Sequence, residues 1–247
     1  MIKFDTKETI RGINIQFSNN FKNIIKIKDS IKICKNALKL LDKDIVEYLK
    51  QNNFKIRIIN KNELEIIQKN EDDNFKNKYD KNKAGFYFWD TKYIYYIYEF
   101  ARDEKTILHE IGHYLDYIFD CIDKSRKIEN LDEYKDKEDE FKKNNIGIDD
   151  KIFFSNRKYI FHRSVLDKNF RNIYYNSNKL YLKKHYNENI REFFAESFAE
   201  YIIYKNKNYL YKKFIKKRKF KDVFNYIDNF INNKNYSKSK NELIKIE

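Results

Sequence analysis

The chain has 247 residues, of which 41% are hydrophobic and 17% aromatic, and it carries a formal net charge of +14. This length fits one large domain or two modest ones, and the aromatic content excludes an intrinsically disordered chain. Lysine is spread through the whole sequence, so the charge is interpreted as a solvated basic surface, with nucleic acid or an anionic membrane as the alternative partner.

Cysteine usage and the N-terminal segment bear on the compartment. Cys34 and Cys121 are too few for a disulfide framework, so we expect two thiols in a reducing compartment, with one bridge as the alternative. The first residues carry charges throughout, and no stretch approaches the ~20 apolar residues of a membrane span. The sequence therefore predicts a soluble monomer without a secretory signal, either cytoplasmic or exported by a non-classical route.

The first third of the chain predicts a helix and a strand. Ser30 is a candidate helix cap, and apolar residues recur at helical spacing as far as residue 50. This stripe consists of Ile31, Cys34, Leu38, Leu41, Ile45 and Leu49. Apolar and polar residues alternate in 54–60, which indicates a strand. The following polar segment, 61–83, predicts no more than one helical turn, at 63–68.

Two runs rich in aromatic and β-branched residues come next, at 85–89 and 92–98. The short polar turn between them predicts a β-hairpin. A helix is expected directly afterwards, capped by Asp103 and continuing to about residue 122 on an apolar stripe. That stripe consists of Ile107, Leu108, Ile111, Leu115, Ile118 and Ile122.

The second half is predicted to be mainly helical. The charged stretch 123–151 indicates a surface helix or loop, and 152–188 shows no clear pattern. Two helices are predicted at about 190–205 and 209–232. The fold class is therefore α+β, with a sheet-and-helix part over 1–122 and a helical part over 123–247.

The motif that carries chemistry is His109-Glu110-Ile111-Gly112-His113, which has the form HExxH. On a helix, side chains four residues apart lie on one face, so both imidazoles can reach the same ion. Imidazole nitrogen suits zinc, and the intervening glutamate can accept a proton from the attacking water. Glu110 is thus the candidate catalytic base. Gly112 is small enough to let another element approach closely.

A catalytic zinc ion needs a third protein ligand, and the helix at 190–205 offers two candidates. Glu192 and Glu196 are four residues apart on one face, bordered by phenylalanine and alanine residues that indicate close packing. Carboxylates facing a packed neighbour are costly unless a positive charge meets them. The alternative is a capping box formed by Asn189 and Glu192, with Glu196 in solvent. Glu133, about twenty residues after His113, is a rival ligand.

The strings HEIGHYLD and EFFAESFAEY resemble the catalytic domain of anthrax lethal factor and the related clostridial Pro-Pro endopeptidases. The resemblance covers about residues 84–205. It implies a single zincin-like domain over 1–247 that hydrolyses internal peptide bonds with one catalytic zinc ion. It also implies that Glu192 is the third ligand and that Glu196 supports a metal-binding histidine.

The family places a tyrosine seven residues before the third ligand, where its hydroxyl stabilises the oxyanion. Here that position is His185, and the tyrosine is one place later, at Tyr186. Either side chain can donate to a developing oxyanion, so both are candidates. The resemblance further implies that an extended protein or peptide substrate pairs with the strand before the metal helix, here Tyr93–Tyr98.

The remaining candidates have plain alternatives. Asp116 follows His113 by one helical turn and is a candidate carboxylate partner of a metal-binding histidine, or a surface aspartate. His162 is interpreted as a core-edge or surface histidine rather than a ligand. Trp89 can line a substrate cleft or pack in the hairpin. The segment 212–221 interleaves basic and aromatic residues. It is either a surface that binds nucleic acid or anionic lipid, or simply the basic face of a helix.

Two other functions compete with that of a zinc endopeptidase. One is a basic module that binds nucleic acid or membranes and keeps a vestigial metal site. The other is an intracellular regulatory zinc peptidase that cuts a repressor. The 79-residue separation of His113 and Glu192 argues against it. Nucleic acid is the less expected partner, because A/T-biased coding alone can account for the high lysine content.

Overall fold

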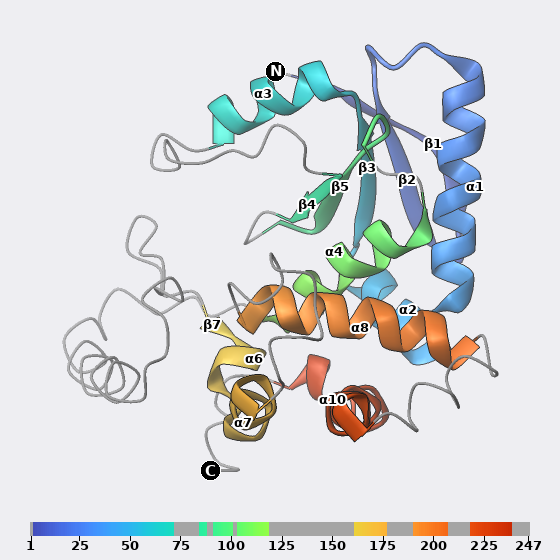
Figure 1. Cartoon of the computed structure of the whole chain (residues 1–247). Coiled ribbons are helices and arrows are strands. Elements are labelled where there is room, and N and C mark those ends of the chain that lie inside the picture. Colours follow the sequence, from blue (N-terminus) through green and yellow to red (C-terminus); the bar gives the residue numbers. More distant parts are fainter. Residues whose placement is uncertain are drawn as a thin grey trace, which may run out of the picture.

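A computed structural model describes residues 2–71, 84–87, 91–100, 103–118, 161–176, 190–206 and 218–238. The fold is α+β, as predicted: a five-stranded mixed sheet is followed by a mainly helical second half (Figure 1). None of the described helices is both long and apolar enough to cross a membrane.

The sheet combines two antiparallel hairpins with a parallel centre. Its strands are β1 (Phe4–Ile10), β2 (Ile13–Ser18), β3 (Lys55–Ile59), β4 (Gly85–Tyr87) and β5 (Tyr93–Ile97). The strand order is β1-β2-β3-β5-β4, in which β2, β3 and β5 run parallel and the two outer pairs run antiparallel. The predicted strand at 54–60 and the predicted hairpin are confirmed as β3 and as the β4–β5 pair.

The β1–β2 hairpin was not predicted from the sequence. Its two-residue turn has positive φ at both central positions, 52° at Arg11 and 84° at Gly12. Turns of this kind match the right-handed twist of the strands that they join. The hairpin adds an edge strand that is largely exposed to solvent.

The predicted helix at 30–50 is two helices, α1 (Ile24–Leu40) and α2 (Lys43–Gln51). Asn23 caps α1, since its side chain accepts a hydrogen bond from the Lys26 amide at 3.1 Å. Ser30, the predicted cap, is buried in the middle of α1. Cys34 is a buried thiol whose pKa is raised by burial.

The helix that carries the HExxH motif is α4 (Glu104–Asp116), and Asp103 caps it as predicted. It is shorter than expected, because residues 117–118 are extended as β6 (Tyr117–Ile118) and pair with β7 (Phe161–His162). The prediction of helix beyond Asp116 is therefore wrong for these two residues.

The other described helices are α3, α6, α7, α8 and α10. Their bounds are Lys61–Glu71, Arg163–Leu166, Lys168–Asn176, Ile190–Asn206 and Arg218–Asn232, and a short 3-10 turn follows at Asn235–Ser237. The helix predicted at 190–205 is confirmed as α8, and the described part of the one at 209–232 as α10. The single turn predicted at 63–68 is instead the longer helix α3.

Helix α4 lies between the sheet and α8 (Figure 1), and this layering positions the site. One apolar core joins the inner face of β2, β3 and β5 to α1, α2, α4, α8 and α10. A smaller cluster on the opposite face packs α3 through Leu64 and Ile67. The metal-binding motif is thus on a helix that is packed on two sides.

The end of α4 is fixed by two buried charged residues. Arg163 donates to the carbonyls of Leu115 at 2.9 Å and Tyr117 at 2.6 Å, and also to the carbonyls of Asn235 and Lys238. Asp116 accepts from the Ser164 amide at 2.7 Å and the Ser164 hydroxyl at 2.6 Å. Together they tie the end of α4 to α6 and to the chain after α10.

Arg163→Met should lower the free energy of unfolding by about 3 kcal/mol, because four carbonyls lose a charged donor. Urea unfolding of the metal-free chain measures this loss. Lys221→Met, at an exposed position on α10, is the matched control and should change stability by less than about 0.5 kcal/mol. Equal stability of the two variants would contradict the role given to Arg163.

Candidate metal centre

The site depends on a close crossing of α4 and α8 at Gly112. A Cβ atom at Gly112 would lie 2.9 Å from the Cα of Ala195 and 3.2 Å from its carbonyl oxygen. Such distances are shorter than van der Waals contact, so the two backbones touch where Gly112 has no side chain. The close packing predicted for both segments is confirmed, and it brings the N-terminal turns of α8 over the HExxH face.

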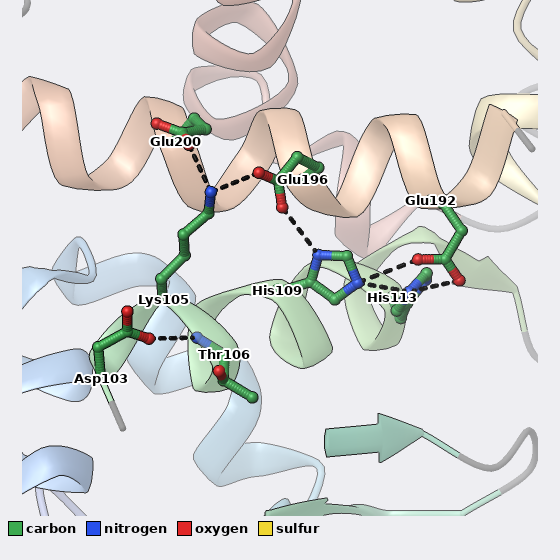
Figure 2. Close-up of polar contacts among 8 residues, drawn as sticks. All are labelled: Asp103, Lys105, Thr106, His109, His113, Glu192, Glu196 and Glu200. Carbon is green, nitrogen blue, oxygen red and sulfur yellow. Dashed lines mark hydrogen bonds and ion pairs between the residues drawn. The ribbon is translucent and has the colours of Figure 1, made fainter. Parts of the chain in front are cut away.

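Three side chains converge at this crossing (Figure 2). The Nε2 atoms of His109 and His113 are 3.1 Å apart. The Glu192 carboxylate lies 3.2 Å from His109 Nε2 through Oε2 and 3.4 Å from His113 Nε2 through Oε1. All three residues are half-buried, and their ligand atoms form a group that could hold a metal ion.

Glu110 is buried and lies against the edge strand β4. A Cβ atom at Gly85 would come within 2.9 Å of Glu110 Cγ and 3.0 Å of its Oε1. Thr106, one turn earlier on α4, lies near the same point of Gly85. The absence of a side chain at Gly85 therefore makes room for the Glu110 carboxylate beside the strand.

The imidazole of His109 is held from both sides. Its Nε2 faces Glu192, and its Nδ1 lies 3.4 Å from Oε2 of Glu196, a buried carboxylate one turn further along α8. The other oxygen of Glu196 pairs with the ammonium of Lys105, which also pairs with Glu200 (Figure 2). Lys105 was not identified from the sequence. The signal that could have found it is its spacing: it lies one helical turn before His109, and its partners Glu196 and Glu200 are also one helical turn apart.

The charges of the site reinforce one another. Burial lowers the pKa of His109, but hydrogen bonds to Glu192 and Glu196 outweigh this effect and raise the pKa to about 10. Burial raises the pKa of Glu192, but the charge of His113 and the bonds to both histidines outweigh it and bring the pKa well below its ordinary value. The group therefore favours a positive charge between the imidazoles and the carboxylates, either a proton or a metal ion.

Asp116 does not have the role predicted for it. Both of its oxygens accept hydrogen bonds from Ser164, and Oδ2 also lies 3.3 Å from His162 Nδ1, without the geometry of a hydrogen bond. The carboxylate thus points to the start of α6 rather than to His113. His162 is buried, which lowers its pKa and favours the neutral imidazole.

The prediction that an extended substrate pairs with the strand Tyr93–Tyr98 also disagrees with the sheet. Within the described part of the sheet, β5 is paired with β3 on one side and with β4 on the other, so its backbone has no open edge. Among the described strands, the outermost one on this side is β4. This strand lies next to Glu110, as the contact at Gly85 shows.

Several predicted residues lie outside the described ranges. They are the oxyanion candidates His185 and Tyr186, the rival ligand Glu133, and Trp89, Cys121 and the basic segment 212–217. The three residues that the sequence placed at the metal, His109, His113 and Glu192, are all described and are brought together.

No known family model matches the chain. A search of curated proteins likewise finds no match. The class of the molecule is therefore defined by its own structure: an α+β protein in which a His-His-Glu group lies between two crossed helices. The resemblance to lethal factor and the Pro-Pro endopeptidases remains a prediction.

Gly112→Ala tests the helix crossing. In an ordinary helix this change stabilises by about 1 kcal/mol, but here the added methyl group meets the Ala195 backbone. We expect a net loss of about 1–3 kcal/mol in the free energy of unfolding and weaker metal binding, because α8 and Glu192 must shift. Urea unfolding of the metal-free chain and metal competition with a chelator measure the two effects. A more stable variant would contradict the crossing.

Proposed function

We propose that the chain is a zinc-dependent endopeptidase of the zincin type. The observation that carries the proposal is the spacing of the ligand atoms: the two imidazole Nε2 atoms are 3.1 Å apart, and each lies 3.2 or 3.4 Å from a different oxygen of Glu192. Zinc bonds of about 2.0–2.1 Å in tetrahedral geometry require edges of about 3.3 Å between ligand atoms. The preformed group thus fits zinc with little rearrangement.

The donor set also supports a catalytic rather than a structural role. Two imidazole nitrogens and one carboxylate oxygen leave one tetrahedral position open, whereas structural zinc sites are closed by four protein ligands. In the described part of the chain, no fourth histidine, cysteine or acidic residue joins the group. Glu192 is 39% exposed, so solvent reaches the group from its side.

When bound, zinc would polarise a peptide carbonyl and lower the pKa of a coordinated water. Glu110 would accept the proton of the attacking water at its carboxylate and return it to the leaving amine nitrogen. Its burial against Gly85 restricts the rotamers available to that carboxylate. Tyr186 and His185 remain the candidates for stabilising the oxyanion.

An extended peptide would bind beside β4, because this strand lies next to the candidate base Glu110. In the described part of the sheet, β4 is paired with β5 alone. Glu110 lies beside this strand at Gly85. A substrate bound beside β4 would therefore have a peptide bond close to the Glu110 carboxylate. Cleavage within a polypeptide rather than at its end is taken from the family resemblance.

The test is zinc content by elemental analysis, followed by cleavage of a peptide library. We expect about one zinc ion per chain and internal cleavage that a chelator stops and added zinc restores. A chain that cannot be loaded with zinc would refute the proposal. In that case, binding of DNA or anionic vesicles that weakens steeply with salt would support the basic binding module instead.

A further inference from the structure

We propose that Lys105 is a positioning residue, which holds the Glu196 carboxylate against His109 and thereby orients the imidazole toward Glu192. This inference rests on the proposed function, since it concerns the same metal group. It adds a residue that lies outside both the HExxH motif and the string EFFAESFAEY. Lys105 touches neither of the metal-binding imidazoles in the contacts that the structure gives it.

The geometry forms a relay across the two helices (Figure 2). The ammonium of Lys105 pairs with one oxygen of Glu196, and the other oxygen faces His109 Nδ1 at 3.4 Å. The opposite nitrogen of the same imidazole faces Glu192 at 3.2 Å. The rotation of the His109 ring is therefore fixed through Glu196, and the rotation of the Glu196 carboxylate through Lys105.

Burial explains why Glu196 needs this partner. Its side chain is 4% exposed, and a buried carboxylate is costly without compensation by charge and hydrogen bonds. Glu200, the second partner of the ammonium, is 23% exposed and can be solvated instead. Loss of Lys105 should thus release Glu196 from its orientation more than it disturbs Glu200.

The position of Lys105 within α4 supports the same conclusion. It is the second residue of the helix, where the macrodipole disfavours a positive charge by about 0.3–1 kcal/mol. The helix itself therefore gives no reason for a lysine there, whereas two carboxylates on α8 do. Burial lowers the pKa of Lys105, but its bonds to Glu196 and Glu200 outweigh this effect and raise the pKa, so the ammonium stays charged.

The experiment measures zinc affinity by competition with a chelator. Lys105→Met should weaken binding about tenfold, the range typical of partners that orient a metal-binding histidine. Lys205→Met is the matched control: this lysine pairs with Asp42 at 3.1 Å, is similarly exposed, and joins α8 to the segment before α2. It should change affinity by less than about twofold, because it lies outside the relay.

A double-mutant cycle separates positioning from general structural damage. If Lys105 acts through Glu196, adding Lys105→Met to Glu196→Gln should cost no further affinity. Glu200→Gln should weaken binding less than Lys105→Met does. Additive losses in the cycle, or equal losses for Lys105→Met and Lys205→Met, would overturn the inference.

A readout without metal keeps the inference separate from the proposed function. In the zinc-free chain with nitrogen-15 histidine, Lys105→Met should shift the imidazole signals of His109, and Lys205→Met should leave them in place. If the wild-type chain binds no zinc, the proposed function fails and these signals alone decide the inference. Unchanged His109 signals in folded Lys105→Met would then overturn it.

Discussion

Glu110→Gln is expected to abolish peptide hydrolysis while the chain keeps its zinc. The amide has nearly the same size as the carboxylate, so it fits the space beside Gly85, but it cannot accept the proton of the attacking water. Loss of a general base of this kind reduces kcat by roughly a thousandfold. Cleavage of a fluorogenic peptide selected from the library, with zinc content measured on the same preparation, gives both quantities.

Glu65→Gln is a suitable control, because Glu65 is exposed on α3, and this helix packs on the opposite face of the sheet from α4. It should retain full activity and full zinc content. Undiminished cleavage by Glu110→Gln would mean that another group takes the proton. Loss of zinc from Glu110→Gln would instead mean that Glu110 helps to hold the metal, and the assignment of roles in the site would have to change.

The second large effect is expected for Glu192→Ala, which should weaken zinc binding by more than about a hundredfold. Removing one of three protein ligands costs more than removing a group that orients a ligand, for which losses of about 10–100-fold are typical. The variant should remain folded, because Glu192 is half-buried and takes no part in the apolar core. Chelator competition measures the affinity, and circular dichroism verifies the fold.

Glu133→Ala distinguishes the two sequence candidates for the third ligand. It should keep zinc at the wild-type level, because the described part of the chain already supplies a complete His-His-Glu group. If Glu133→Ala loses zinc and Glu192→Ala retains it, the ligand comes from the charged stretch, and the contact between α4 and α8 has only a packing role.

The parts of the site that follow from local periodicity could be predicted from the sequence. The helical repeat alone places His109 and His113 on one face, and it gives Glu192 and Glu196 a shared face four residues apart. Their contacts across the crossing confirm that both faces meet. Lys105 was not predicted, because its role depends on the register of α8 against α4, which no local pattern contains.

The N-terminal elements were harder to predict, for physical reasons. Strand β1 is exposed along most of its length, so it lacks the apolar alternation that marks a half-buried strand. Helix α1 begins with Ile24 and Ile25, which are 67% and 72% exposed. Apolar residues on the solvent side obscure the start of the helix, and the prediction therefore began at Ser30.

Strand order was beyond the sequence because it is a non-local property. Strand β4 precedes β5 in the sequence, but in the described sheet β5 lies beside β3, and β4 is the outermost strand. A hairpin prediction identifies the two partners but does not say which of them faces the rest of the sheet. The substrate strand was accordingly assigned to the inner member of the pair.

Because the site needs the crossing at Gly112 and Ala195, it can assemble only late in the synthesis of the protein. His113 precedes Glu192 by 79 residues, so both histidines leave the ribosome well before the third ligand is translated. In the proposed enzyme, hydrolytic capacity would appear only after α8 has been translated and has docked. The nascent chain would thus be protected from cutting itself or its neighbours until its own folding is nearly complete.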